Sequence, residues 1–139
     1  MRTSKILGFL FILFLAFGFV SSHLESGEDV RKNGYVIDFG YSPAEIISGN
    51  PSNFVFNLIN ETTEVFVNFT SLWVRISSED EIIFAGDFFP KDSSVPFVFV
   101  FPDSGGYSIE TEFYNGQILL VDYEFKIKVR ESSRFPFYI

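Results

Sequence analysis

Hydrophobic and polar side chains alternate with a period of two along most of the chain from Tyr35 onward. This alternation is typical of β-strands that turn one face to a core and the other to water. No window of about 11 residues in this region carries a helical apolar stripe. The pattern predicts an all-β protein with strands over these ranges: Tyr35–Tyr41, Phe54–Ile59, Val65–Phe69, Leu72–Ser77, Ile82–Phe88, Val95–Phe101, Tyr107–Phe113 and Leu119–Val129.

The last two predicted strands have the clearest alternation, and Asn115-Gly116 lies between them. An Asn-Gly pair accepts positive φ at both central positions of a type I′ turn, the common turn of tight hairpins. We therefore expect a β-hairpin whose turn is formed by Asn115 and Gly116.

The predicted strand Val95–Phe101 is apolar on both faces, which favours a central strand that is covered on both sides. Its two faces are made by Val95, Phe97, Phe99 and Phe101 and by Val98 and Val100. Short strands separated by Gly, Pro and Asn predict a sandwich or small barrel, here with about seven or eight strands.

The first 22 residues have the composition of an export signal. Arg2 and Lys5 precede an uninterrupted apolar run over residues 6–20, and Ser21 and Ser22 follow it. Because a membrane span needs about 20 apolar residues, a cleaved signal helix fits this run better than an anchor. We expect cleavage after Ser22, with Gly18 as the alternative site. The mature protein would be periplasmic, at the cell surface or extracellular, and a retained leader would anchor it in a membrane.

The remaining chain divides into three parts by composition. Residues 23–34 are polar and are interpreted as a spacer without secondary structure, residues 35–130 form the sandwich, and residues 131–139 form a C-terminal tail. The tail contains Phe135, Phe137 and Tyr138, which could dock on a partner domain or on a membrane surface.

Composition excludes several classes of protein. The 139 residues include 20 Phe, no Cys and a net charge of −8. A disordered chain would lack so many aromatic residues, a disulfide framework needs Cys, and a nucleic-acid-binding protein needs a basic surplus. Although an oxidising compartment permits disulfides, this core must hold by packing alone.

Two features resemble immunoglobulin-like domains. Asp103, Gly105 and Tyr107 have the Asp-x-Gly-x-Tyr spacing found at the entry to strand F, where the resemblance implies a hydrogen bond from the tyrosine hydroxyl to the backbone. Trp73 lies where strand C would carry the core tryptophan, and we expect it in the core. A regular strand would instead put Trp73 on the face of Arg75, opposite Leu72, so an exposed Trp73 is the open alternative.

The sequence also resembles small exported sandwich domains of the YtkA-like and CopC-like kind, over about residues 35–129. The resemblance is carried by Val36–Pro43, Phe56–Leu58, Leu72–Ile76 and Phe101–Tyr107. It implies extracytoplasmic copper handling through His and Met ligands. This chain departs from that pattern, since its only Met is Met1 and its only His is His23.

Candidate chemistry is sparse. If cleavage follows Ser22, His23 becomes the amino-terminal residue, whose amino group and imidazole could chelate Cu(II), but two donors do not make a selective site. A catalytic triad needs a base held in place by the fold, and His23 lies in the spacer. Asn60 and Asn68 begin Asn-x-Thr glycosylation patterns, and we expect Asn60, in a turn, to be more accessible than Asn68, in a strand.

These observations predict an exported, non-enzymatic immunoglobulin-like sandwich without a cofactor, which acts as a binding or structural module. We expect a protein partner, bound through a sheet edge, loops or the aromatic tail, and no nucleic acid. The alternative function is copper handling outside the cytoplasm through His23.

Overall fold

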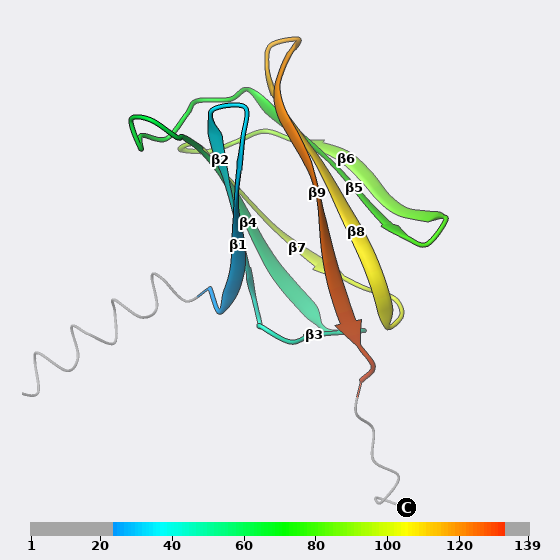
Figure 1. Cartoon of the computed structure of the whole chain (residues 1–139). Helices are drawn as coiled ribbons and strands as arrows, with labels where there is room; N and C mark the ends of the chain where they lie inside the picture. Colours follow the sequence, from blue (N-terminus) through cyan, green and yellow to red (C-terminus); the bar gives the residue numbers. More distant parts are fainter. Residues whose placement is uncertain (1–23, 133–139) are drawn as a thin grey trace, which may run out of the picture.

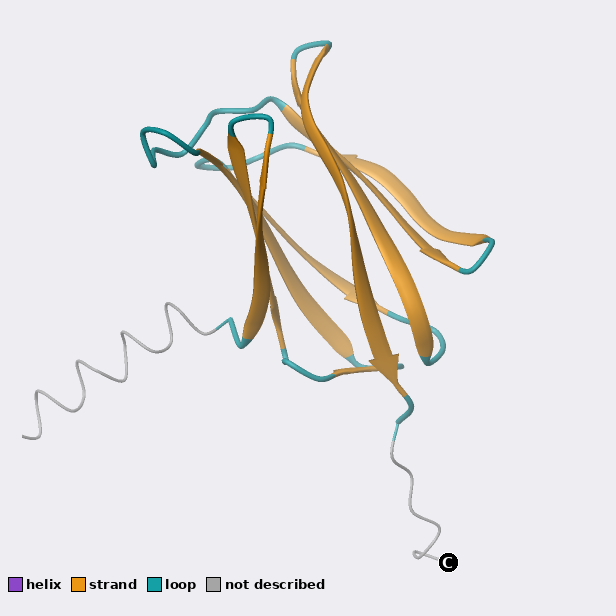
Figure 2. Ribbon diagram, viewed as in Figure 1, coloured by secondary structure: helices purple, strands orange, loops and turns teal. Residues whose placement is uncertain are grey.

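Two β-sheets packed face to face make up residues 24–132, which are the residues that the computed structural model describes (Figure 1). Strands and loops account for all of them (Figure 2). The strands are β1 (Ser26–Lys32), β2 (Tyr35–Ser42), β3 (Ile46–Ile47), β4 (Pro51–Asn60), β5 (Ser71–Ser78), β6 (Glu81–Phe88), β7 (Ser94–Val100), β8 (Gly105–Asn115) and β9 (Ile118–Arg130).

Sheet 1 has the strand order β1-β2-β4-β7, and sheet 2 has the order β3-β9-β8-β5-β6. All neighbouring strands are antiparallel except β3 and β9. This arrangement is an immunoglobulin-like sandwich, with β2, β4 and β7 in the places of strands A, B and E and with β5, β8 and β9 in those of C, F and G. Within residues 24–132, sheet 1 has no strand in the place of D, beside β7.

The all-β sandwich predicted from the sequence is therefore confirmed, with nine strands instead of seven or eight. The inward residues of both sheets follow the predicted alternation, since a buried side chain at every second position fills the space between the layers. The residues that are at most 1% exposed include Ile37, Phe39, Phe54, Phe56, Leu58, Leu72, Val74, Ile76, Ile109, Phe113, Val121 and Phe125.

Aromatic rings from the two sheets meet at the centre of this core. The Phe39 ring lies 4.6 Å from that of Phe56 in sheet 1 and 4.6 Å from that of Phe125 in sheet 2, measured between ring centroids. Phe56 in turn approaches Phe113 edge-on at 6.5 Å. These rings join the two layers at the centre of the core.

The expectation that residues 23–34 lack secondary structure is wrong for most of the segment. Ser26–Lys32 form β1, which pairs with β2 through a tight turn at Asn33-Gly34, where φ is 54° and 84°. Two successive positive φ angles are typical of a type I′ turn, and Asn-Gly is its preferred pair. Backbone pairing with β2 therefore orders a strand whose own side chains are mostly polar.

The strand predicted over Val65–Phe69 is also wrong. These residues form a loop with one isolated bridge, between Phe66 and Ile59 at the end of β4. Val65 and Phe66 are exposed, Val67 is half-buried against the core, and Phe69 is buried in it, where its ring contacts that of Phe113 at 5.1 Å. The alternation here marks a loop with one buried anchor.

The β8–β9 hairpin forms as predicted, but its turn lies one residue further along the chain. Asn115 pairs with Ile118, so Gly116 and Gln117 are the central residues, and only Gly116 has a positive φ, of 64°. A positive φ at the first central position alone is typical of a type II′ turn. Thr70 supports this turn, since its hydroxyl accepts the Gly116 N–H at 2.7 Å and donates to the Tyr114 carbonyl at 3.1 Å.

The corner before β8 has the hydrogen bond that the immunoglobulin resemblance implies. The Tyr107 hydroxyl donates to the backbone carbonyl of Asp103 at 2.7 Å. Tyr107 is buried against Phe101 at a ring distance of 4.7 Å, and Gly105 has a φ of 133°, which strongly favours glycine. The corner thus fixes the entry of the chain into β8.

We expect Tyr107→Phe to lower the free energy of unfolding by about 1 kcal/mol, the typical net contribution of one intramolecular hydrogen bond. The ring, and therefore the packing against Phe101, is retained. Tyr123→Phe is the matched control, since the Tyr123 hydroxyl makes no hydrogen bond to the described residues. Urea unfolding followed by circular dichroism measures both variants, and an equal change in the two would contradict a stabilising corner.

Candidate binding surfaces

The outward face of sheet 2 carries a concentration of carboxylates, which we call the acidic face. Strand register places its side chains in two rows across β5, β8 and β9. The rows are Trp73, Glu112 and Asp122 and, one pleat further, Arg75, Glu110 and Glu124.

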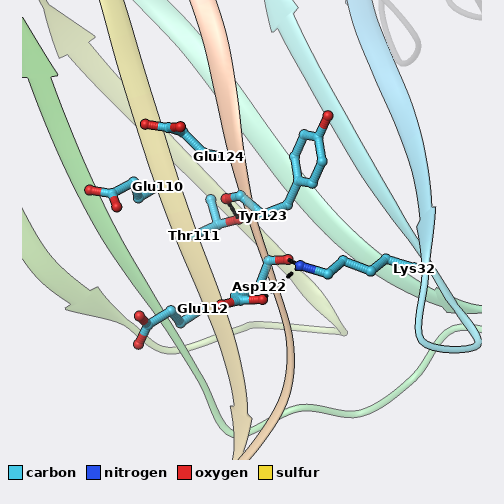
Figure 3. Close-up of a pocket in the computed structure, with 7 residues that line it drawn as sticks. All are labelled: Lys32, Glu110, Thr111, Glu112, Asp122, Tyr123 and Glu124. Atoms are coloured by element: carbon cyan, nitrogen blue, oxygen red, sulfur yellow. Dashed lines mark hydrogen bonds and ion pairs between the residues drawn. The ribbon is translucent and has the colours of Figure 1, made fainter.

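An open hollow lies on this face where it meets β1 (Figure 3). Lys32, at the end of β1, crosses from sheet 1 and donates to the carboxylate of Asp122 at 2.9 Å and to its backbone carbonyl at 2.8 Å. Glu110, Glu112 and Glu124 line the rest of the hollow. Lys32 therefore connects the two sheets and also donates a hydrogen bond to a backbone carbonyl on the edge of β9.

Trp73 is not in the core, so the expected core position is wrong; Trp73 lies on the outward face, as the alternative has it, but is half-buried and not exposed. Leu72 and Val74 are fully buried, and the period of two turns Trp73 to the outward face, where the Arg75 guanidinium lies over its ring at 5.5 Å. Arg75 also forms an ion pair with Glu110, and this hydrogen bond raises the pKa of the guanidinium. Trp73 and Arg75 thus form a half-buried, partly neutralised part of the acidic face.

The other carboxylates of the acidic face also have partners. Glu112 accepts from the Tyr114 hydroxyl at 2.5 Å, and this bond raises the pKa of that phenol. Glu124 lies 3.5 Å from the Lys126 ammonium. In the described part of the chain, no group of three or more His, Cys, Asp or Glu side chains is arranged to hold a metal ion. The acidic face is therefore a solvated surface whose carboxylates each have a side-chain partner within the chain.

The second surface is the outward side of β7, which we call the valine edge. It comprises Pro96, Val98 and Val100, with Val98 60% exposed and Val100 48% exposed. The expectation of a central strand covered on both sides is wrong here. β7 has β4 as its single neighbour within the described residues, and its two faces differ, since Phe97 and Phe99 pack on the core while the valines face outward.

Hydrogen-bond directions show that the far side of β7 has free backbone groups. Ser94 exchanges two backbone hydrogen bonds with Lys91, at 2.9 and 3.1 Å, so its N–H and C=O point away from β4. Because the directions of the backbone N–H and C=O groups alternate along a strand, those of Val98 and Val100 and the carbonyl of Pro96 also point away from β4. Pro96 has no backbone N–H, so no unpaired donor arises at its position. The valine edge thus presents two N–H donors and three carbonyl acceptors without a partner strand in the described chain.

A pair of carboxylates lies on the same outer face of sheet 1, on the other side of β4 from the valine edge. Asp38 of β2 is opposite Asp29 of β1 and next to Asn57 of β4, whose amide donates to Asp38 at 3.4 Å. Partial burial raises the pKa of Asp38, and the neighbouring Asp29 raises it further, while Asn57 opposes both. The outer face of sheet 1 therefore has a polar half on β1 and β2 and an apolar half on β7.

The two glycosylation patterns lie in positions opposite to those expected. Asn60 is half-buried at the end of β4, and its side-chain oxygen accepts the N–H groups of Thr62 and Thr63 at 2.9 Å each. Asn68 lies in the loop before β5 and is exposed, with its oxygen accepting from Ser93 at 2.9 Å. Asn68 is consequently the more accessible acceptor.

The remaining sequence-based site candidates lie outside the described residues. These are the leader with its apolar run over residues 6–20, His23, and the tail residues Phe135, Phe137 and Tyr138. Residues 24–132 contain no helix with the length and hydropathy needed to cross a membrane.

Sequence reasoning missed Lys32 and Thr70, because each acts on a residue far along the chain. It also missed the free side of β7. One signal was available, since a proline inside an otherwise regular strand indicates an edge position.

No protein-family model matches the chain, and a search of curated proteins finds no match either. Among solved structures, the chain is similar to a candidate lipoprotein from Bacillus anthracis, at 9% sequence identity and a TM-score of 0.41, over 77% of this chain and 86% of that one. It is also similar to a superoxide reductase (neelaredoxin) variant from Ignicoccus hospitalis, at 13% identity and a TM-score of 0.41, over 70% and 79%. Function must therefore be inferred from the surfaces of this molecule.

We expect Asp38→Asn to stabilise the protein at pH 7 and to have little effect near pH 3. A raised pKa means that the stability gained by protonating Asp38 in the folded state is present at low pH and is lost as the pH rises through that pKa. The gain at pH 7 should stay below about 1 kcal/mol, because the pair is half-exposed and screened. Urea unfolding at both pH values measures it.

Glu61→Gln is the control for the loss of one negative charge, since Glu61 lies in an exposed turn outside the Asp29–Asp38 pair. A gain of equal size for Glu61→Gln, or a gain for Asp38→Asn that persists at pH 3, would contradict the assignment.

Proposed function

We propose that this protein is an exported, non-enzymatic binding module that accepts an extended segment of a protein partner along the valine edge. The observation that carries the proposal is the combination of unpaired backbone groups with exposed apolar side chains on β7. Extended peptides bind other proteins by adding a strand to such an edge, with backbone hydrogen bonds giving affinity and alternate side chains giving specificity.

The chemistry of the valine edge indicates the class of segment. Its outward side chains are apolar, and no charged residue lies between Val95 and Val100. A partner strand with apolar residues at every second position would cover Val98 and Val100 and would satisfy the free N–H and C=O groups. Exposed edges in natural proteins are usually protected by charge, so an unprotected one of this length suggests a surface that is used.

A non-enzymatic role is supported by the side chains available for chemistry. The full sequence has no Cys and one His, at position 23. Four carboxylates of the acidic face, on Glu110, Glu112, Asp122 and Glu124, each have a hydrogen-bond or ion-pair partner. General acid–base catalysis by two carboxylates instead needs groups whose environments separate their pKa values.

Export is supported by the amino-terminal sequence. The basic start, the apolar run over residues 6–20 and the two serines that follow have the order of a secretory leader. The acidic balance of the chain, with 18 Asp and Glu against 10 Lys and Arg, favours a soluble, well-dispersed product outside the cytoplasm.

A display library of random eight-residue peptides, selected on the full chain after export, tests the proposal. We expect the selected peptides to carry apolar residues at alternate positions and to bind Val98→Lys about tenfold more weakly, a difference of about 1.4 kcal/mol. The new lysine points outward from the edge, so the core is unchanged. Isothermal titration calorimetry with the selected peptides gives the affinities.

Val65→Lys is the matched control, because Val65 is also 60% exposed but lies in the loop before β5. Equal affinities of the peptides for Val98→Lys and Val65→Lys would refute binding at the valine edge. Recovery of the protein in the cytosol of producing cells, with residues 1–22 intact, would refute export.

A further inference from the structure

We propose that the valine edge binds the valine edge of a second copy of this chain, so that two β7 strands pair antiparallel about a two-fold axis at Phe99. The inference rests on the proposed function, since it names an occupant for the same edge. Three features of the described residues support it: the absence of charge on this part of sheet 1, the register that the outward positions of β7 allow, and the aromatic rings on its inner side.

β4 and β7 are free of charged residues in a chain that is strongly acidic. Neither strand contains Asp, Glu, Lys or Arg, whereas the whole chain has a net charge of −8. The edge strands β1 and β6 carry carboxylates, on Glu28 and Asp29 and on Glu81 and Asp87. Because like charges directly opposite each other destabilise a strand pair, two identical acidic copies are repelled at such edges. The valine edge lets them approach without opposing carboxylates.

The prolines at the two ends of the edge restrict where the two-fold axis can lie. An axis at Val98 would place Pro96 opposite Val100 of the partner subunit, so a proline ring would face a strand at a position that needs an N–H. An axis at Val100 would bring Pro102 into the same conflict with Val98 of the partner subunit. An axis midway between the two valines avoids both conflicts, because Pro96 then lies opposite Pro102 of the partner subunit, beyond the end of its β7.

This remaining axis, at Phe99, uses every free N–H of the edge. Axes nearer the start of β7 are closed, since the partner strand would lie beside Ser94, whose outer N–H and C=O already bond to Lys91. With the axis at Phe99, Val98 forms a hydrogen-bonded pair with Val100 of the partner subunit, and the reverse. Both free N–H groups of each copy then donate to a carbonyl of the other. The outward valines also cover one another, because opposed residues share a face.

The same axis brings together the rings on the inner side of β7. Phe99 is half-buried, and its ring lies 4.8 Å from that of Phe101 and 5.8 Å from that of Phe84 in sheet 2. At the axis, Phe99 and Phe99 of the partner subunit form a non-hydrogen-bonded pair, with Cα atoms about 4.5 Å apart. This is the closest spacing in an antiparallel pair, and aromatic pairs at such positions stabilise sheets. Each ring therefore covers the solvent-facing part of the other.

Self-pairing closes the edge and does not extend into a fibre. Both copies use the same strand, so the contact is isologous and leaves no valine edge for a third copy. The paired segment is short, so the interface is smaller than the roughly 1,600 Å² of standard stable complexes, and the dimer dissociates on dilution. A reversible dimer protects the apolar edge and releases it to a partner segment that competes for the same backbone groups.

Analytical ultracentrifugation of the full chain after export measures the association. We expect the mean mass to rise from monomer toward dimer between about 1 and 500 µM, and the dissociation constant of Val98→Lys to be at least about tenfold larger. The two added lysines of the dimer lie beside the axis and repel each other. Val65→Lys is the matched control, because Val65 is also 60% exposed but lies outside the edge. A monomer at every concentration, or equal weakening by both variants, would overturn the inference.

Disulfide cross-linking tests the position of the axis, since the chain has no cysteine of its own. The proposed axis puts Val98 and Val100 of the partner subunit about 5.5 Å apart between Cα atoms, within reach of a disulfide. Identical valines lie diagonally, at about 7–8 Å, which is too far. We expect a mixture of Val98→Cys and Val100→Cys to cross-link under mild oxidation at least about tenfold faster than either variant alone. Faster cross-linking of Val98→Cys with itself would refute the axis at Phe99.

Peptide binding separates this inference from the proposed function. If a second copy occupies the edge, the selected library peptides convert the dimer to monomer, because they compete for the same backbone groups. If the chain is monomeric at every concentration and the peptides still require Val98, the inference fails and the proposed function stands. If the dimer requires Val98 and the peptides do not, the edge serves self-association alone, and the proposed binding of other segments fails.

Discussion

Packing of aromatic rings between the two sheets is the interaction on which the rest of the molecule depends. The chain has no cysteine, so no disulfide joins the layers. Phe39, Phe56 and Phe125 make the closest contacts across the centre, at ring distances of 4.6 Å, and burial of each ring contributes roughly 2–3 kcal/mol. The core is thus built from inward side chains, and the two candidate binding surfaces lie on the outward faces of the sheets.

The strand edges are protected unequally, and this difference supports the proposed binding role of β7. Lys32 occupies a carbonyl of β9, and β3 pairs with the last residues of that strand. β1 is rich in charged residues. β7, in contrast, has neither a charge nor a covering strand within the described residues. β6, the far edge of sheet 2, exposes Ile82 but carries Glu81 and Asp87, whereas β7 carries no charged residue. This difference supports the proposal that β7 has a dedicated partner.

The sequence predicted those parts of the fold that depend on local alternation, and it failed where a distant partner decides. Hairpin β8–β9 and the inward residues of β4 and β5 were accessible because period two and turn residues are local signals. β1 was missed although Asn33-Gly34 is a strong turn signal, since its polar side chains hide a strand held by backbone pairing with β2. Alternation also could not tell whether Val98 faces a second layer or solvent, nor anticipate that Lys32 reaches Asp122, because both depend on sheet order.

The polypeptide enters and leaves the sandwich at one pole. The start of β1 and the end of β9 both lie at the lower end of the sandwich in Figure 1, while the β1–β2 and β8–β9 hairpins lie at the upper end. A membrane or a neighbouring domain joined to either terminus would therefore lie at this end of the sandwich. The hairpin tips would then stand outermost, and the sides of both sheets would be presented to molecules that approach laterally.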